Sequence, residues 1–227
     1  MSQTSVAAAY RARAGRRLTG LALAALALAL AALLDVATGP AFLSPQAVAR
    51  SVLGLAQDRT IDAIVWKIRM PIAALAVLVG ATLGLTGAIM QTILANPLAS
   101  SYTLGVSAGA GFGAALVIVF GAALPIPEVA AIPLAAFVFS GFACAGVYAI
   151  GAMRGATPEL LALAGVAMLF LFQALLSLLQ FIASPEALQQ IVFWLFGSLQ
   201  RATWDKAALL AATLALVAPM LIRDAWA

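Results

Sequence analysis

The sequence predicts an all-α integral membrane protein, a polytopic helical bundle with about six transmembrane spans. Hydrophobic residues make up 65% of the 227 residues and charged residues 9%, whereas a soluble domain carries about a quarter charged residues. The mean hydropathy is +1.10. The apolar residues also gather in segments of about 20, which is the length of helix that crosses the hydrocarbon core of a bilayer.

Six apolar segments are the expected spans, and each is bounded by charged residues or by Pro and Gly. They cover residues 18–34, 71–94, 101–121, 130–151, 160–182 and 207–222. The basic tail, residues 1–17, is expected in the cytoplasm because four arginines precede the first span. A cleaved signal peptide is the alternative, but residues 18–34 are longer than a typical signal core. We therefore expect one membrane domain over residues 1–227.

The composition excludes several functions. The net charge of +4 is compatible with nucleic-acid binding, but topology already explains basic residues beside a first span, so no nucleic-acid partner is expected. Cys144 is the only cysteine and histidine is absent. These counts exclude an intrachain disulfide, a Cys/His metal site and a histidine-based triad. We expect neither a metal nor another cofactor.

Enzymatic chemistry has little support in the sequence. The stretch GAGFGA, residues 109–114, matches a relaxed dinucleotide-binding pattern, but it lies inside an apolar span without the strand that this pattern needs. There is no Walker A sequence, so ATP hydrolysis is expected only in a separate partner. An intramembrane enzyme is an alternative, although the spans offer Gln and Ser but no acid, base or set of metal ligands. A structural membrane scaffold is a further alternative.

Glycines four residues apart recur in the second and third expected spans. The pairs are Gly80 with Gly84, Gly105 with Gly109, and Gly109 with Gly113. This spacing lets the backbones of two helices approach closely in lipid, so we expect these residues at helix contacts. The alternative is that glycine is simply common in membrane helices.

Three segments between spans are expected on the outer side of the membrane, residues 35–70, 122–129 and 183–206. Residues 35–70 form the longest polar stretch. Residues 183–206 contain an apolar piece, 191–199, that is too short to span, so we predict a short helix at the outer interface. Trp194 and Trp204 would lie at headgroup depth or line a cavity, and Gly197 lies near the end of the piece.

The connection between the second and third spans reads ANPLASS, residues 95–101. Pro97 lacks an amide donor and disfavours helix at Asn96, so we predict a tight turn at the inner face. Backbone leaves helical geometry in a membrane protein at a boundary, or where it is buried or lines a cavity. A plain turn with no particular chemistry is the alternative.

Residues 65–116 carry an ordered series of short motifs. These are Arg69-Met70-Pro71, Gly80-Ala81, Thr86-Gly87, Gln91, Asn96-Pro97-Leu98-Ala99 and Leu104-Gly105-Val106-Ser107. Residues 160–168 and 193–204 continue the series. Over about residues 18–223 the chain resembles the FecCD-type permease subunits of ABC importers for iron-siderophores, haem and cobalamin. It departs from that family at Ile72, where a second arginine is usual, and at Ser101, where a proline is common.

The resemblance implies a permease of roughly ten spans, of which about six are present here. Two such chains, identical or different, would enclose a pathway in the bacterial inner membrane. Their partners would be a cytoplasmic ABC ATPase dimer and an external substrate-binding protein. The implied function is import of an iron-siderophore or another iron chelate, with haem or cobalamin as the alternative. The sequence ends before the family's cytoplasmic coupling segment, so we expect this chain to insert in a membrane but not to transport unaided.

The resemblance also implies roles for particular residues. Asn96 and Leu98 in one inner loop, and Thr157 and Pro158 in the other, would form the inner gate. The fifth span and the short helix around Trp194 would border the pathway. A group of basic residues on the outer side would dock the binding protein, or alternatively anchor the chain at the interface. This group consists of Arg59, Lys67 and Arg69.

Overall fold

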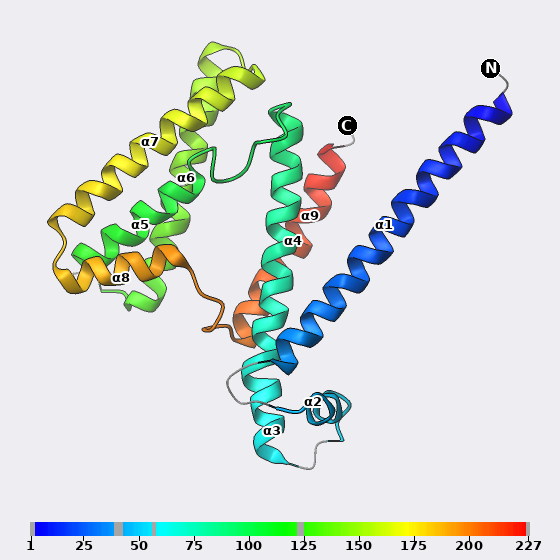
Figure 1. Ribbon diagram of the computed structural model, residues 1–227. Coiled ribbons are helices and arrows are strands. Elements are labelled where there is room, and N and C mark those ends of the chain that lie inside the picture. The colour runs from blue at the N-terminus through cyan, green and yellow to red at the C-terminus, as the bar shows by residue number, and fades with distance from the viewer. Residues whose placement is uncertain (1–2, 39–42, 56–57, 122–124, 226–227) are drawn as a thin grey trace. The chain divides into compact units, whose positions relative to one another are not determined.

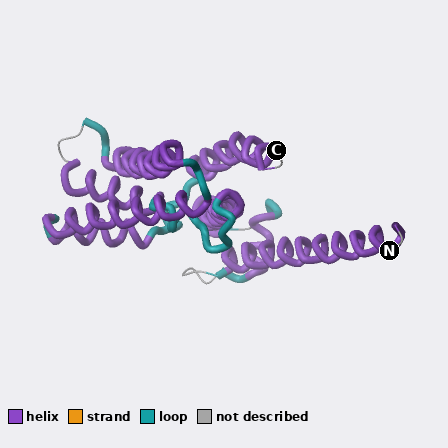
Figure 2. Tube along the Cα trace, turned by 90° about the horizontal axis from the view of Figure 1, so that it is seen from above, coloured by secondary structure: helices purple, strands orange, loops and turns teal. Residues whose placement is uncertain are grey.

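The computed structural model describes residues 3–38, 43–55, 58–121 and 125–225, and every regular element in these ranges is a helix (Figure 1, Figure 2). The elements are α1 (Gln3–Ala37), α2 (Pro45–Val52), α3 (Arg59–Ile64), the π-helical turn η1 (Val65–Arg69), α4 (Met70–Ile93), α5 (Val106–Phe120), α6 (Glu128–Arg154), α7 (Pro158–Ile182), α8 (Pro185–Phe196) and α9 (Trp204–Ala225). The predicted all-α fold is confirmed.

Five helical stretches of the described chain are long and apolar enough to cross a membrane: Gly15–Ala37, Arg59–Ile93, Glu128–Arg154, Pro158–Ile182 and Trp204–Arg223. The third expected span, residues 101–121, gives only α5, which has 15 residues. At 1.5 Å per residue α5 measures about 22 Å, which is less than the roughly 30 Å of the hydrocarbon core. The helix is short because residues 101–105 form turns.

The chain divides into two compact units, which we describe separately. The N-terminal unit comprises residues 1–79 and 199–212, and the central unit comprises residues 80–198 and 213–227. The core of the N-terminal unit is a small apolar cluster from α1, α2, η1 and α4. It consists of Val36, Val48, Val65 and Ala73, with Leu43, Ile61 and Met70 packed against it.

The polar stretch that we expected at residues 35–70 contains two short helices. Ser44 caps α2 by accepting a hydrogen bond from the amide of Ala47, and Pro45 occupies its first turn, both typical of a helix start. Asp58 caps α3 in the same way through the amide of Thr60. Sequence reasoning missed α2 because it is only about two turns long, too short for a clear apolar period. It missed α3 because the second span was expected to begin at residue 71, whereas the continuous helical stretch begins at Arg59.

α3, η1 and α4 form one continuous helical stretch with a π-helical turn in it. The amide of Met70 donates to the carbonyl of Val65, five residues back. Pro71 follows and has no amide hydrogen to give to the carbonyls of Trp66 and Lys67, which would be its partners in π and α geometry. Pro71 is buried, so water does not replace the missing donor there. The π-helical turn is the local adjustment to this proline.

Three helices of the central unit form a bundle, and a fourth helix, α8, packs at one end of it. α5 packs on α6 and α7, α6 also packs on α7, and α8 packs on α5 (Figure 1). A Cβ added at Gly109 would lie 2.7 Å from the carbonyl oxygen of Phe139 on α6, and one at Gly113 would meet the carbonyl of Ala135. These glycines therefore allow α5 and α6 to run antiparallel in direct backbone contact.

Aromatic and aliphatic side chains fill the rest of the central unit. Phe112 of α5 meets Phe139 of α6 edge to face at a ring separation of 5.0 Å, and it also lies near Phe172 of α7. At the α8 end, Ile191 is 1% exposed and packs with Ala115, Leu176 and Leu179. The predicted short helix after the fifth span is confirmed, and it begins at Pro185.

Candidate functional site

The loop between α4 and α5, residues 94–105, begins with a regular helix-ending motif. The amide of Asn96 donates to the carbonyl of Gln91 at 3.1 Å, and the amide of Ala95 donates to that of Thr92 at 3.2 Å. Ala95 has a φ of 43°, a left-handed conformation that usually belongs to glycine at this position. The helix therefore stops abruptly just before Pro97.

The next turn places the side chain of Leu98 outward. The Asn96 side-chain oxygen accepts a hydrogen bond from the amide of Leu98 at 2.9 Å, and the Asn96 carbonyl accepts one from the amide of Ala99 at 3.1 Å. Leu98 is 81% exposed, whereas Ala99 is 4% exposed. Asn96 thus acts locally, as an Asx turn that holds Leu98 away from the protein.

The second half of the loop is fastened to α7. Ser100 and Thr103 bond reciprocally, with the Thr103 hydroxyl donating to the Ser100 carbonyl at 2.8 Å and accepting from the Ser100 amide at 2.9 Å. Gly105 has a φ of 76°, and a Cβ there would lie 2.7 Å from the backbone nitrogen of Leu169. A Cβ at Gly165 would lie 3.0 Å from the Cα of Leu104. There is no room for a side chain at Gly105 or Gly165, because the backbone of the loop lies directly against the backbone of α7.

The loop between α6 and α7 lies at the same end of the central unit, because α5 runs antiparallel to α6 and α6 antiparallel to α7. α6 ends at Gly155, which has a φ of 80°. The Thr157 hydroxyl caps α7 by accepting from the amide of Leu160 at 3.3 Å, and Pro158 is in the first turn. The sequence-predicted gate residues, Asn96, Leu98, Thr157 and Pro158, are therefore all on two loops at one end.

The opposite end of the central unit carries α8. Ser184 caps this helix through the amide of Ala187, and Gly197 ends it with a φ of 71°. Trp194 is half-buried, while Phe193 and Phe196 are exposed. These positions put Trp194 and Gly197 at the end of α7 remote from Thr157.

One face of α7 is polar although the helix is long enough to span a membrane. Gln173, Ser177 and Gln180 follow at helical spacing, and the first two are exposed. The residue that directly precedes each of them is buried against the rest of the unit. These residues are Phe172, Leu176 and Leu179. Polar side chains at membrane depth usually face a protein partner or a water-filled cavity rather than lipid.

The three basic residues predicted for docking differ in their surroundings. Arg59 and Lys67 are exposed, but Arg69 is 7% exposed and donates to the carbonyl of Val36 at 2.5 Å. Its other terminal nitrogen is buried and has no partner among the described residues. Arg69 is thus not an exposed docking residue in this structure, because its guanidinium binds the carbonyl end of α1, where the helix dipole favours a cation. Docking of a binding protein through Arg69 stays a prediction.

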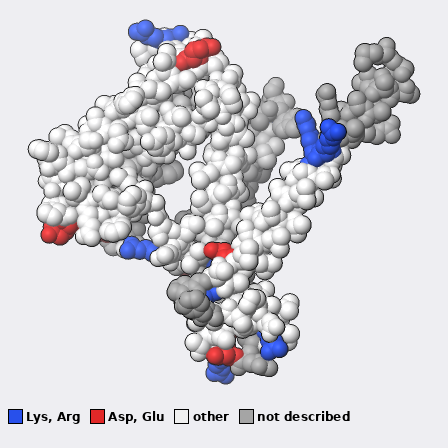
Figure 3. Space-filling view, in the orientation of Figure 1, with Lys and Arg blue, Asp and Glu red and all other residues white. Residues whose placement is uncertain are grey.

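Among the helix-packing glycines, only part of the set is in contact within the described chain. Gly105, Gly109 and Gly113 lie against neighbouring backbone, but an added Cβ at Gly80 or Gly84 would meet nothing within 4 Å. Packing through Gly80 and Gly84 stays a prediction. Among the described residues no group of three His, Cys, Asp or Glu side chains could hold a metal ion. Charged side chains are also sparse on the face shown in Figure 3.

The sequence matches the FecCD transport family over residues 26–225. This chain belongs to the FecCD transport family. The match covers nearly all of the described helices, including α8 and the two loops that carry the predicted gate residues. It confirms the resemblance that the motifs indicated, and it identifies the chain as a multi-pass membrane protein of a transport family.

Relatives of this FecCD chain are named as transporter permeases. It is 36% identical over 194 residues to a protein named as an ABC transporter permease of Methanocaldococcus jannaschii, covering 82% of this chain and 55% of that protein. It is 31% identical over 210 residues to the Fe(3+)-citrate import system permease of Bacillus subtilis. This alignment covers 90% of this chain and 60% of that protein. The chain thus spans a little more than half the length of these relatives.

A solved structure described as a metal-chelate type ABC transporter in an inward-facing conformation has a similar fold. The TM-score is 0.74 at 29% identity, over 92% of this FecCD chain and 62% of the other. Together with the family match, this similarity extends the likeness from sequence motifs to the arrangement of the helices.

Sequence reasoning missed one polar network of the FecCD chain, in its N-terminal unit. The Ser51 hydroxyl donates to Asp62 at 2.7 Å, the Trp66 indole donates to the Ser51 carbonyl at 3.2 Å, and the Trp204 indole donates to the Trp66 carbonyl at 2.8 Å. Trp66 is not among the residues that the sequence predicts for a site. The one feature of the sequence that could have indicated this network is Pro71, because the proline leaves the Trp66 carbonyl without an intrahelical donor.

Proposed function

We propose that this chain is a transmembrane permease subunit of an ATP-driven, binding-protein-dependent importer, and that its cargo is an iron chelate. The observation that carries the proposal is the family match over residues 26–225. The relative that imports ferric citrate and the similar metal-chelate transporter support the cargo class. Haem or cobalamin import by the same mechanism is the alternative.

The inner gate of this permease consists of the two loops at one end of the central unit. Leu98, held outward by Asn96, is the apolar side chain that closes against a second permease chain. Thr157 and Pro158 begin α7 beside it. An exposed leucine on a rigid loop supports this role, because such a side chain gains about 1.5–3 kcal/mol when it is buried and loses that gain when the gate opens.

The polar face of α7 lines the pathway. Gln173, Ser177 and Gln180 offer neutral hydrogen-bonding groups, which favour weak and transient contact with a passing chelate. α8, with Trp194 and Gly197, borders the outer end. A pathway of this kind discriminates little between cargoes, so selectivity resides mainly in the external binding protein.

The partners are a second permease chain, a cytoplasmic ATPase dimer and an external binding protein. Arg59 and Lys67 contribute to docking of the binding protein by attracting its carboxylates. Residues 1–17 lie in the cytoplasm of a bacterium, because the arginines at that end favour the inner side of the plasma membrane.

The test is ATP hydrolysis by the complex reconstituted with its ATPase, second chain and binding protein. We expect stimulation by binding protein loaded with a ferric chelate, relative to empty binding protein. Haem-loaded and cobalamin-loaded binding protein are the matched comparisons. Stimulation only by haem or cobalamin would overturn the cargo assignment, and no stimulation by any cargo would overturn the transport assignment.

A further inference from the structure

The loop of residues 94–105, which we call the Leu98 loop, ends in a close contact with α7. A Cβ added at Gly165 would lie 2.5 Å from the Cδ2 atom of Leu104, 3.0 Å from its Cα atom and 3.2 Å from the carbonyl oxygen of Thr103. Gly165 is buried and is the only glycine in α7. Leu104 therefore occupies the space that the missing side chain of Gly165 leaves on this helix.

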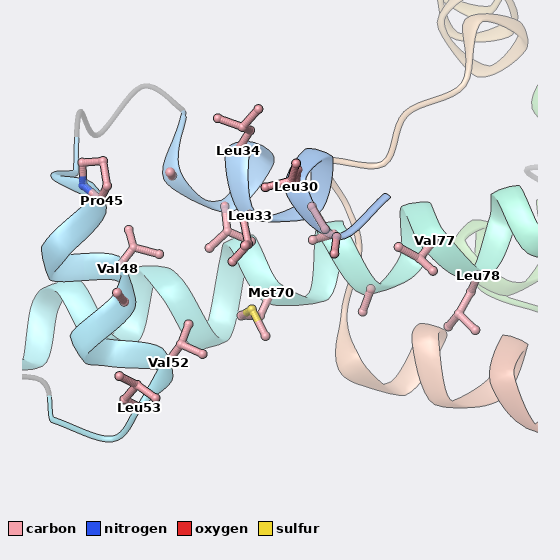
Figure 4. Close-up of a pocket in the computed structure, with 17 residues that line it drawn as sticks. Leu30, Leu33, Leu34, Pro45, Val48, Val52, Leu53, Met70, Val77 and Leu78 are labelled. Atoms are coloured by element: carbon pink, nitrogen blue, oxygen red, sulfur yellow. The ribbon is translucent and has the colours of Figure 1, made fainter. Parts of the chain in front are cut away.

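This contact is closer than the packing in the N-terminal unit. There, α1, α2 and α4 surround an apolar groove of about 1030 Å³ (Figure 4), and helices beside so much free space can shift without steric overlap. The Leu98 loop has no such freedom toward α7, because a Cβ at Gly105 would also lie 2.7 Å from the backbone nitrogen of Leu169. Close-packed segments of this kind transmit a displacement from one to the other.

Hydrogen-bonded turns connect Leu98 to this contact. The amide of Ala99 donates to the Asn96 carbonyl at 3.1 Å, and the amide of Leu104 donates to the Ser100 carbonyl at 3.3 Å. Ala99 is also buried. The turns run without interruption from the Asx turn at Leu98 to the contact with α7, so Leu98 keeps its position relative to that helix.

The connection of the Leu98 loop to α4 is of another kind. Residues 80–93 of α4 belong to the same unit, but among the described residues they take no comparable part in the packing of α5, α6 and α7. At the junction Ala95 has a φ of 43°, and Pro97 follows two residues later. The loop is thus joined to α4 by the chain and to α7 by packing.

α7 is suited to carry a displacement along its length. It has no internal proline between Pro158 and Ile182, whereas α6 contains Pro133, and prolines are the usual sites of sharp kinks in helices. The polar face of α7 begins two turns after the contact with the loop. At 1.5 Å per residue, Gln173 lies about 12 Å from Gly165 along the helix axis.

We propose that the contact between Leu104 and Gly165 couples the inner gate to the pathway, because the Leu98 loop and α7 move as one body. This inference rests on the proposed permease function and deepens it by assigning the movement of Leu98 to α7. Cargo that binds Gln173 and Ser177 more strongly in one position of α7 than in another shifts the helix toward that position, and Leu98 moves with it. Leu104 is a positioning residue, since it acts on Leu98 through the loop.

The first test measures two distances in the complete transporter by pulsed electron paramagnetic resonance, with spin labels on one permease chain. The background is Cys144→Ser, because Cys144 is the only cysteine. Tyr102→Cys with Phe181→Cys reports on the loop and α7, and Tyr102→Cys with Leu83→Cys reports on the loop and α4. All three labelled positions are exposed.

The nucleotide-free and ATP-bound states are compared. The distance from Tyr102 to Phe181 should stay constant, because the loop and α7 move together, whereas the distance from Tyr102 to Leu83 should shift. A shift between Tyr102 and Phe181 would overturn the proposal. Constant distances in both pairs would overturn it as well, since the loop would then not move.

The second test is efflux of preloaded ferric chelate without ATP, from proteoliposomes that contain the complete transporter. Gly165→Val pushes Leu104 away from α7 and should raise efflux as much as Leu98→Ala does. Ala167→Val, at an exposed position of the same helix, is the matched control and should leave efflux unchanged. Because Gly165 acts through Leu98, Gly165→Val combined with Leu98→Ala should leak no more than either single variant. Effects that multiply, or unchanged efflux in Gly165→Val, would contradict the coupling.

ATP-driven uptake by the unmodified transporter separates the coupling from the proposed function. No uptake there would overturn the permease proposal and the coupling with it. Normal uptake together with a shift between Tyr102 and Phe181 would overturn the coupling alone. The distance measurement changes no residue of the contact, so it decides the question even if Gly165→Val fails to fold.

Discussion

Both units have apolar clusters, but in the central unit helix backbones also meet at glycine, whereas in the N-terminal unit hydrogen bonds from arginine, serine and tryptophan side chains link the elements. In the central unit, Gly109 and Gly113 bring α5 against α6. In the N-terminal unit, Arg69 binds α1, and Ser51, Trp66 and Trp204 link α2, η1 and α9.

The difference has a physical consequence. Backbone contact at glycine requires that there is no side chain, so any added side chain pushes the two helices apart. Such close packing suits a part of the chain that must keep one conformation. Hydrogen bonds between short elements contribute about 1 kcal/mol each and fail one at a time. We therefore expect substitutions to have larger effects in the central unit than in the N-terminal unit.

The largest expected effect is that of Gly109→Val. A Cβ at this position would lie 2.7 Å from the carbonyl oxygen of Phe139, so α5 and α6 must separate. Overpacking of this kind costs about 1–3 kcal/mol or more, and it should sharply lower the unfolding temperature in detergent. Gly141→Val is the control, because a Cβ at Gly141 would meet no described atom within 4 Å. Equal losses would show that helix propensity, and not backbone contact, controls stability.

Arg69→Met should have the second largest effect. It removes a charge-assisted hydrogen bond from the end of α1, which is worth about 1.5–3 kcal/mol, while keeping most of the side-chain volume. Unfolding in denaturant would be compared with that of Lys67→Met, which changes an exposed neighbour. If both variants unfold alike, Arg69 does not hold α1 in place.

Trp204→Phe should destabilise the N-terminal unit by about 1 kcal/mol, the value of one neutral hydrogen bond. The effect depends on Pro71, because this proline leaves the Trp66 carbonyl free to accept. In a Pro71→Ala background the restored amide competes for that carbonyl, so Trp204→Phe should then cost less. A double-mutant cycle on thermal unfolding measures this coupling, and strictly additive effects would refute it.

The smallest expected effect is a gain in stability. Ala95 has a φ of 43°, a conformation that costs an L-residue about 1–2 kcal/mol, so Ala95→Gly should raise stability by a fraction of that amount. Ala88→Gly is the control within α4, where glycine costs about 1 kcal/mol relative to alanine. A loss of stability in Ala95→Gly would mean that the loop does not keep this geometry.

The sequence was sufficient for the apolar spans, the short helix before Gly197 and the turn at Asn96, because each depends on local chemistry. Apolar length predicts a span, and Pro97 ends a helix by itself. The burial of Arg69 could not be predicted in this way, since its partner, the Val36 carbonyl, is 33 residues away. The same holds for Trp204, whose partner Trp66 is 138 residues away. Contacts between distant segments depend on the assembled fold.

Gly80 and Gly105 also show that contacts between distant segments cannot be predicted from local sequence. Both belong to glycine pairs of identical spacing, yet Gly105 lies against the backbone of α7 and Gly80 meets nothing among the described residues. Spacing alone indicates that close approach is possible, but not which helix approaches.

The central claim is that the loop around Leu98 closes the permease on its inner side. The measurement is efflux of preloaded ferric chelate without ATP, from proteoliposomes that contain the complete transporter. Leu98→Ala removes most of an apolar side chain from the closed gate, so efflux should rise about tenfold. Val129→Ala, at an exposed position at the opposite end of α6, should leave efflux unchanged. Efflux from Leu98→Ala that equals that of the unmodified transporter would contradict the gate, and with it our account of how this chain works.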